Sequence, residues 1–481
     1  MGVLSNLEPK EVFHYFEELC QIPHPSYHEK KISDYCVDFA QKHGLEVHQD
    51  SIGNIIMIKE ATPGYENVEP LILQGHLDMV CEKEPGCTID FEKDGLSLMI
   101  DGDVITAQGT TLGGDDGIAI AYILAIFASN TLEHPRLEAV FTVSEEVGME
   151  GAHAIDLTPL KGHKLLNLDS EEEGYLLTSC AGGCSAIVTV PGEWEIRHGV
   201  SCELTVTGLR GGHSGAEIDK GRANSNLLLG RVLVALEGKV RYSIAAMAGG
   251  LKDNAIARET KAKLIVDGKD AEKLAELVAK VAVAVSKEYA VTDPDIKITA
   301  ELLGEGEAKV LTEECRSRML TLICLLPNGI QTMSADIPGL VETSLNLGIL
   351  TLTEEALSLR YALRSSVQTA RDFLAQKLEL LTRQLGGSVA IEGAYPAWEF
   401  KKDSALRRDM VRVYKEMYGK EPVIQAIHAG LECGLLAGKI SDLDAVSIGP
   451  DMKDIHTTEE TLSISSTKRV WEYIIEVIRQ K

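Results

Sequence analysis

Histidine and carboxylate side chains gather in five short segments of this 481-residue chain. The segments contain His76 with Asp78, Asp115 with Asp116, Glu145 with Glu146, Asp169, and Asp451 with His456. Each segment alone is a weak signal, because a carboxylate at a strand end is more often a turn or helix-capping residue than a ligand. Imidazole mixed with carboxylate suits zinc, and also cobalt or manganese, whereas calcium and magnesium prefer oxygen ligands only. Together the segments predict a transition-metal site, provided that the fold brings them together.

Short apolar runs precede most of these segments and predict the strands that position them. The runs cover residues 71–73, 137–144, 164–168 and 445–448; a helical stretch follows Gly117, and His456 precedes a Thr-Thr-Glu-Glu helix start. Strands that alternate with helices predict an α/β fold with a largely parallel sheet. Open sheets of this kind place their binding sites at the carboxyl ends of the strands. We therefore expect the five segments to converge at that end of the sheet.

The middle of the chain has a different pattern. After residue 183, alternating strands such as 185–190 and 201–207 accompany amphipathic helices at 224–237 and 271–287. Beyond residue 393, helices at 403–418, 431–438 and 466–479 return with the strand at 445–448. The sequence therefore predicts an inserted α+β domain over residues 184–393, and a first domain built from residues 1–183 and 394–481.

Charge and composition exclude several classes of partner. The formal net charge of −26 comes from 73 acidic and 47 basic side chains, and such a field repels nucleic acid and anionic membranes. Ten cysteines without a C-x-x-C pair read as reduced thiols of an intracellular protein. The first twenty residues lack the features of a signal peptide, and the longest apolar run is shorter than the about 20 residues that span a bilayer. We expect a soluble, cytoplasmic protein that binds neither nucleic acid nor membranes.

The motifs of the chain are highly specific when they are taken jointly. They are Gly75-His76-Leu77-Asp78, Leu112-Gly113-Gly114-Asp115-Asp116-Gly117, Ser144-Glu145-Glu146, Asn167-Leu168-Asp169, His428-Ala429-Gly430-Leu431-Glu432-Cys433-Gly434 and His456. In these motifs the sequence resembles the aminoacyl-histidine (Xaa-His) dipeptidases, close relatives of the cytosolic non-specific dipeptidase called peptidase D. They belong to the co-catalytic di-zinc clan, which also includes aminoacylases and carnosinases. The resemblance covers essentially the whole chain.

The resemblance implies a role for each residue of the metal site. It assigns a bridging Asp115, with His76 and Asp169 completing one zinc site and Glu146 and His456 completing the other. Glu145 becomes the general base, and Asp78 becomes the residue that orients His76. Spacing alone leaves open the choice between Asp115 and Asp116, and between Glu145 and Glu146. The family pattern also implies a cis Asp115–Asp116 peptide bond.

Four further residues match substrate-binding positions of the family. His213, within Gly211-Gly212-His213-Ser214, would hydrogen-bond the developing oxyanion, although alone it reads as an ordinary histidine of a surface loop. Asn254 and Arg364 would bind the substrate, and the planar fork of Arg364 suits a peptide's terminal carboxylate. Gly430 would offer backbone N–H groups to the same carboxylate.

The expected function is hydrolysis of short peptides, including Xaa-His and β-Ala-His, by a hydroxide held between two zinc ions. Two divalent ions, three carboxylates and one hydroxide are together neutral, and metal coordination lowers the pKa of water to about 7. An aminoacylase or another amide hydrolase of the same clan is the alternative. A scaffold that only binds metal is disfavoured, since Glu145 is no ligand in the family and is still a carboxylate here. The resemblance also implies a homodimer, with residues 184–393 as lid and dimerisation domain.

Overall fold

The computed structural model describes residues 2–481, and these form two compact units. The first unit comprises the described part of Met1–Ser179 together with Phe400–Ala426 and Leu431–Lys481, and the second comprises Cys180–Glu399 and Ile427–Gly430. The short segment Ile427–Gly430 joins the second unit because the N–H of Ala181 lies 3.2 Å from the carbonyl oxygen of Ile427 and 3.1 Å from that of Ala429. The predicted domain boundaries, at residues 183/184 and 393/394, do not assign the segment Ile427–Gly430 to the second domain.

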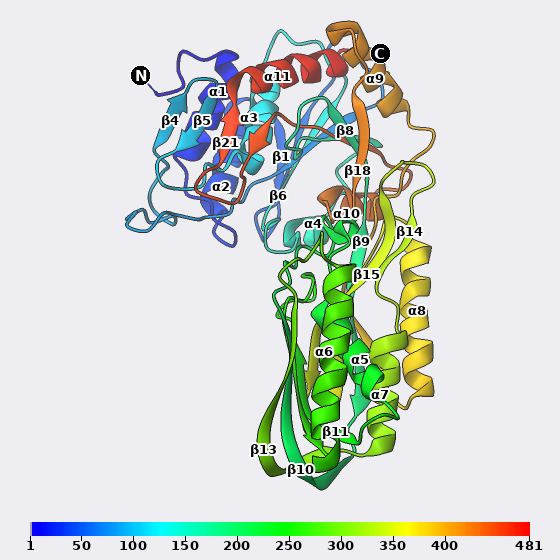
Figure 1. Ribbon diagram of the computed structural model, residues 1–481. Coiled ribbons are helices and arrows are strands. Elements are labelled where there is room, and N and C mark those ends of the chain that lie inside the picture. The colour runs from blue at the N-terminus through cyan, green and yellow to red at the C-terminus, as the bar shows by residue number, and fades with distance from the viewer. Residues whose placement is uncertain (1) are drawn as a thin grey trace. The chain divides into compact units, whose positions relative to one another are not determined.

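An eight-stranded sheet forms the framework of the first unit (Figure 1). In spatial order its strands are β1 (Glu46–Gln49), β2 (Ile55–Lys59), β6 (Leu137–Thr142), β3 (Leu71–His76), β7 (Lys164–Asn167), β19 (Asp444–Ser447), β8 (Tyr175–Cys180) and β18 (Val423–Ile427). The central strands β6, β3, β7 and β19 run parallel, and they are buried almost throughout, as their apolar runs predict. Strands β1, β2 and β8 pair antiparallel and extend this centre on both sides.

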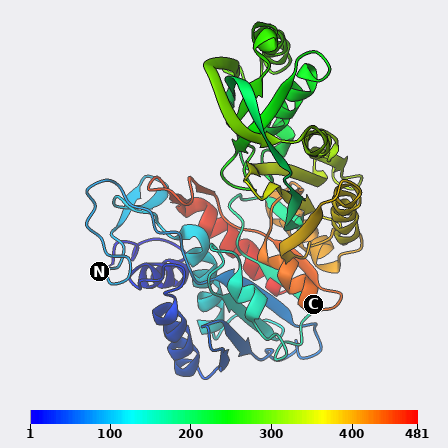
Figure 2. The ribbon, with the colours of Figure 1, turned by 90° about the horizontal axis from the view of Figure 1, so that it is seen from below.

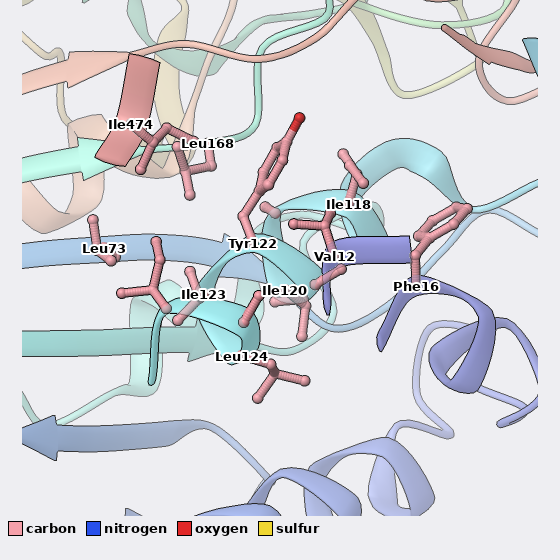
Figure 3. Close-up of a cluster of buried hydrophobic side chains, with 14 of the residues drawn as sticks. Val12, Phe16, Leu73, Ile118, Ile120, Tyr122, Ile123, Leu124, Leu168 and Ile474 are labelled. Carbon is pink, nitrogen blue, oxygen red and sulfur yellow. The ribbon is translucent and has the colours of Figure 1, made fainter. Parts of the chain in front are cut away.

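Helices pack against this sheet and complete the first core. They are α1 (Lys10–Cys20), α2 (Lys30–Lys42), α3 (Gly114–Ala128), α4 (Glu150–Ala154), α9 (Ala405–Tyr418), α10 (Glu432–Lys439) and α11 (Ile464–Ile478). Because α3 is buried on almost every side and uncharged beyond its first turn, it is a core helix rather than an amphipathic one. Val12 and Phe16 of α1 and Leu73 of β3 lie around it (Figure 3). Gly75 permits this close packing, since a Cβ there would lie 2.8 Å from the Cβ of Ala119.

A small antiparallel sheet in the same unit carries a loop near the C-terminus. Its strands, in spatial order, are β20 (Met452–Lys453), β21 (Thr461–Ser463), β5 (Val104–Ala107) and β4 (Leu98–Asp101). β20 and β21 form a hairpin, and its loop holds His456. The helix start predicted directly after His456 is wrong, because α11 begins only at Ile464, where the side chain of Ser463 accepts a hydrogen bond from the N–H of Ser466.

The second unit consists of a nine-stranded antiparallel sheet and four α-helices. Its strands are β13 (Lys297–Leu311), β10 (Trp194–Thr207), β12 (Thr260–Val266), β11 (Tyr242–Gly249), β15 (Val341–Leu352), β16 (Ala356–Ser365), β9 (Gly182–Pro191) and β17 (Ser388–Tyr395), with β14 (Gly329–Met333) paired to β15. The helices are α5 (Ser225–Leu236), α6 (Ala271–Glu288), α7 (Glu313–Leu325) and α8 (Gln368–Gln384) (Figure 2). Burial alternates along β12 and much of β16, which indicates that one face of this sheet is packed.

Within residues 2–481, no helix is both long and apolar enough to cross a membrane.

Candidate metal centre

His76 is the last residue of β3, and its imidazole faces two carboxylates. Its Nε2 lies 3.0 Å from Oδ1 of Asp115 and 3.6 Å from Oδ1 of Asp169. The other ring nitrogen, Nδ1, donates a hydrogen bond to the backbone carbonyl of Asp78 at 3.0 Å, and it lies 3.4 Å from Oδ1 of the Asp78 carboxylate. With the hydrogen on Nδ1, the lone pair of Nε2 points at the carboxylates, which is the tautomer that a metal ligand needs.

The carboxylate of Asp115 lies between two histidines. Its Oδ1 faces His76 at 3.0 Å, and its Oδ2 faces Nε2 of His456 at 3.1 Å. Asp115 has non-helical backbone angles in the first turn of α3, after Gly113 in the left-handed conformation. The Asp115–Asp116 peptide bond is cis, which confirms that expectation. A carboxylate with one oxygen directed at each of two histidines can be shared by two cations.

Glu146 and His456 form the second half of the cluster. Oε1 of Glu146 lies 2.8 Å from Nε2 of His456. The two glutamates follow β6 after a turn at Ser144, whose φ is +53°. Asp78 holds this turn, because its Oδ1 accepts the backbone N–H of Glu145 at 2.9 Å and its Oδ2 accepts that of Glu146 at 3.2 Å. Asp78 therefore fixes the glutamates in addition to His76.

The distances within the cluster fit ligands that share an ion. Two ligand atoms of one tetrahedral zinc ion, each about 2.0–2.1 Å from it, lie about 3.3 Å apart. The nitrogen-to-oxygen distances are 3.0 Å for His76–Asp115, 3.6 Å for His76–Asp169, 3.1 Å for His456–Asp115 and 2.8 Å for His456–Glu146. Three groups have ligand atoms within 4.8 Å of one another: His76–Asp116–Asp169, His76–Glu145–Glu146 and Asp115–Glu146–His456. The donor set therefore fits metal ions that take imidazole and carboxylate together.

Asp116 differs from its neighbour in what it contacts. It is fully buried, and its Oδ2 accepts the backbone N–H of His76 at 3.0 Å. Its Oδ1 has no hydrogen-bond partner among the described residues. Burial, with the charge of Asp169, raises the pKa of Asp116 well above its usual range. Asp116 thus holds the backbone of β3, whereas Asp115 directs both oxygens at histidines.

Buried negative charge dominates the electrostatics of the cluster. Burial, with the charges of Asp115 and Glu146, raises the pKa of Asp169 to about 6. Burial raises the pKa of Glu145 well above its usual range, and the charge of Asp169 adds to this effect. Hydrogen bonds to Asp115 and Glu146 raise the pKa of His456 to about 10. Burial is the main cause of the shifts of Asp169 and Glu145, and neighbouring carboxylates add to them; the carboxylates are also the cause at His456. Divalent cations would offset this negative charge.

In the second unit, His213 lies beside the guanidinium of Arg364, with 3.4 Å between Nε2 and Nη2. The backbone N–H of Ala216 donates to Nδ1 of His213 at 3.1 Å, so a neutral ring carries its hydrogen on Nε2. Burial and the charge of Arg364 lower the pKa of His213, which favours the neutral ring. Arg364 also donates to Oη of Tyr395 at 3.1 Å, and its Nε has no partner among residues 2–481. With a neutral His213, two donors thus lie side by side, an arrangement that suits an anionic acceptor such as a carboxylate or an oxyanion.

Asn254 and Gly430 also lie in the second unit. The backbone carbonyl of Asn254 accepts the N–H of Ser214, the neighbour of His213, at 2.8 Å, and its side chain is exposed. Gly430 lies two residues before α10, because this helix begins at Glu432. Gly430 is therefore outside the first turn, and only its own N–H is available for the predicted role.

Two buried glutamates support the cluster in roles that the sequence does not predict, although Glu432 stands in one of the quoted motifs. Glu29 accepts hydrogen bonds from the N–H and the hydroxyl of Ser144 at 2.9 and 2.8 Å. Glu432 accepts hydrogen bonds from the side chains of Gln74 and Thr142, both at 2.6 Å. Their partners are distant in the sequence, so no local pattern could have indicated these contacts.

Comparison with known proteins gives matches along nearly the whole chain. The profile of peptidase family M20/M25/M40 matches residues 72–480. The cytosol non-specific dipeptidase of Escherichia coli (strain K12) is 35% identical over 487 residues, which cover 100% of this chain and 99% of that protein. The crystal structure of aminoacylhistidine dipeptidase from Vibrio alginolyticus is similar with a TM-score of 0.92 and 35% identity, over 99% of this chain and 97% of that chain. Aminopeptidase PepT from Bacillus cereus shares the fold at 16% identity, with a TM-score of 0.54 over 98% of both chains.

Proposed function

The chain belongs to peptidase family M20/M25/M40, and we propose on that premise that it is a dipeptidase which hydrolyses Xaa-His and related dipeptides with two zinc ions. The names of the two relatives at 35% identity, a cytosol non-specific dipeptidase and an aminoacylhistidine dipeptidase, support this substrate class. The observation that carries the two-ion proposal is the carboxylate of Asp115, whose two oxygens face His76 and His456 at 3.0 and 3.1 Å.

The proposed centre divides its ligands between two ions. His76, Asp169 and Asp115, which face one another, would hold one ion, and Glu146, His456 and Asp115 would hold the other. Zinc suits this donor set, and cobalt or manganese would also fit it. Asp116 is left out of both ligand sets because it already accepts the backbone N–H of His76.

Glu145 is the general base of the proposed reaction. Bound divalent ions would lower the pKa of a coordinated water to about 7 and polarise the scissile carbonyl. The carboxylate of Glu145 accepts a proton from the attacking water and returns it to the leaving amine. Asp78 positions this residue through its backbone N–H at 2.9 Å, and it keeps Nδ1 of His76 protonated through its own backbone carbonyl at 3.0 Å.

The second unit supplies groups that recognise the substrate. We assign the peptide's terminal carboxylate to Arg364, because its fork can bind two oxygens and its Nε has no partner among the described residues. We assign the developing oxyanion to Nε2–H of His213. The side chain of Asn254 and the N–H of Gly430 are additional donors in this scheme.

The proposed enzyme works in the cytoplasm as a homodimer. The name of the Escherichia coli relative places that protein in the cytosol, which supports the same compartment for this chain. The homodimer, with the second unit as lid and dimerisation domain, rests on the family resemblance. Light scattering during size-exclusion chromatography gives the mass that tests it.

A substrate panel on zinc-reloaded protein tests the proposed function. The purified protein is stripped with a chelator, reloaded with zinc and assayed with Ala-His, β-Ala-His, a tripeptide and N-acetyl amino acids. We expect Ala-His to be cleaved fastest. Faster cleavage of N-acetyl amino acids would identify an aminoacylase instead, and no cleavage by protein that holds two zinc ions would overturn the proposal.

A further inference from the structure

Glu460 lies at the end of the β20–β21 hairpin loop and is almost completely buried, with 3% of its surface exposed. Its carboxylate accepts hydrogen bonds from successive backbone N–H groups of the turn that leads into α3. Oε2 accepts those of Leu112 at 2.7 Å and Gly113 at 3.1 Å. Oε1 accepts those of Gly114 at 2.8 Å and Asp115 at 3.4 Å. One side chain thus binds the whole turn that presents Asp115.

The turn needs an acceptor of this kind. The N–H groups at the start of a helix have no partner within the helix, and a buried N–H without a partner is costly. A carboxylate bonds such groups more strongly than a neutral oxygen does. The fit is close, since a Cβ on Gly114 would lie 3.2 Å from Oε1 of Glu460. The position of the Asp115 backbone therefore depends on where Glu460 is held.

The loop that holds Glu460 also carries His456, four residues earlier. His456 and Asp454 both have positive φ angles, +61° and +52°, which few residues other than glycine adopt. The loop meets Asp115 at two points: His456 faces its side chain at 3.1 Å, and Glu460 accepts its backbone N–H at 3.4 Å. The separation of His456 from Asp115 is thus fixed from both sides.

We infer that Glu460 is a positioning residue, which sets Asp115 relative to His456 and so controls how tightly these two residues and Glu146 hold their shared ion. This inference rests on the two-ion centre of the proposed function. Glu460 acts through Asp115 and His456, and it contacts neither the ion nor the substrate. The alternative is a helix cap that only stabilises the fold.

Zinc affinity distinguishes the two roles. Glu460→Gln keeps the size of the side chain but turns one acceptor oxygen into an NH₂ group that faces N–H donors. Glu138→Gln is the matched control: Glu138 is fully buried in the same unit, accepts the N–H groups of Lys161 and Gly162 at 3.0 and 2.9 Å, and pairs with Ile72, at the opposite end of β3 from His76. Metal-free proteins are titrated with Zn²⁺ against a chromophoric chelator, and melting temperatures are measured in parallel.

We expect Glu460→Gln to weaken one of two zinc sites by about 10- to 100-fold, the usual effect of a residue that orients a ligand. The visible spectrum of the Co²⁺-loaded variant should change, and kcat should fall more than KM rises. Glu138→Gln should lower the melting temperature and leave both affinities unchanged. In a His456→Ala background, Glu460→Gln should have little further effect on affinity, because both act on the same site.

The other possible results overturn the positioning role of Glu460, either alone or together with the two-ion function. If the wild type binds fewer than two zinc ions, the two-ion function fails and the inference fails with it. If the wild type binds two and Glu460→Gln binds both equally tightly, the positioning role is overturned while the function stands. Should Glu460→Gln not fold, Glu460→Asp is titrated instead: it keeps the charge but is one methylene shorter, and unchanged zinc affinity there also overturns the inference.

Discussion

The carboxylate of Asp78 accepts the backbone N–H of Glu145 at 2.9 Å through Oδ1, the same oxygen that lies 3.4 Å from Nδ1 of His76. Its other oxygen accepts the hydroxyl of Ser26 at 2.8 Å and the N–H of Glu146 at 3.2 Å. One buried carboxylate therefore ties the ends of β3 and β6, which carry a proposed ligand and the proposed base, to a common point.

Asp78→Asn should weaken zinc binding by about 10- to 100-fold, because the amide places a donor against a backbone N–H and loosens both strand ends. Asp50→Asn is the control, since Asp50 accepts backbone N–H groups of Ile52 and Gly53 at 3.0 and 2.9 Å in a turn before β2. Zinc titration of both variants tests this prediction, and equal zinc affinities of Asp78→Asn and Asp50→Asn would contradict it.

Glu145 and Glu146 should respond differently to the same substitution. Glu145→Gln removes the proposed base but no ligand, so we expect both zinc ions to remain while turnover of Ala-His falls by a factor of about 100 to 10,000. Glu146→Gln removes a ligand charge beside His456 and should lose zinc together with activity. The zinc content of each variant from elemental analysis, measured together with its turnover of Ala-His, distinguishes the two roles. If Glu145→Gln lost zinc and Glu146→Gln kept it, the two roles would have to be exchanged.

Removal of metal should destabilise the first unit, because its buried carboxylates then repel one another. We expect a chelator to lower the melting temperature at pH 8 and added zinc to restore it. Asp169→Asn should melt higher than the wild type without metal, because burial and the charges of Asp115 and Glu146 raise the pKa of Asp169 to about 6 and its ionised form is unfavourable. With zinc present the order should reverse, as the variant lacks a ligand. Equal melting temperatures with and without chelator would argue against a metal centre.

Arg364→Lys should lose recognition of the substrate's terminal carboxylate, since lysine cannot bind it through a planar fork. We expect KM for Ala-His to rise by about 10- to 100-fold, which corresponds to one charge-assisted hydrogen bond. The amide of Ala-His lacks that carboxylate, so its KM should be similar in wild type and variant. A KM that rises equally for both substrates would assign Arg364 a general structural role.

The stability of the second unit should depend on His428 at acid pH. Burial, with the charge of Arg364, lowers the pKa of His428 to about 4, whereas an unfolded histidine titrates at about 6.5. Between these pH values the unfolded state binds more protons than the folded state. The free energy of unfolding is therefore highest above pH 6.5 and falls as the pH decreases towards 4. At pH 5 the free energy of unfolding should have decreased by up to about 2 kcal/mol through this histidine, and His428→Gln should abolish that decrease. Urea unfolding of both proteins at pH 7 and pH 5 measures it, and identical pH dependence would exclude the effect.

The parts of the fold that could be predicted are those whose sequence pattern follows from burial. The central strands are apolar runs because both faces of the sheet are covered, and α5 and α6 show the expected apolar stripe. Helix α8 was not predicted, because its buried face includes Arg371 and Thr382 beside two leucines. The guanidinium of Arg371 is satisfied by the carbonyl oxygens of Gly183 and Tyr395, partners that are remote in the sequence.

The site could be predicted to the level of segments but not of atoms. The segments after β3, β6, β7 and β19 meet because parallel strands end on the same side of a sheet. The sequence cannot separate Asp115 from Asp116, since the difference lies in which backbone and ring atoms each carboxylate faces. Glu460 and Leu112 lie 348 positions apart in the sequence, so no spacing rule could predict their contact.

The position of β19 between β7 and β8 has a consequence for synthesis on the ribosome. The two flanking strands emerge early, and the strand that separates them, Asp444–Ser447, emerges near the end. Until then β7 and β8 present unpaired edges, and the chain lacks His456. Cys180–Glu399 of the second unit, in contrast, has already been made by that point. Domains generally fold as units during translation, so the second unit should form first, and the nascent first unit must wait for its last strand before it can take up metal.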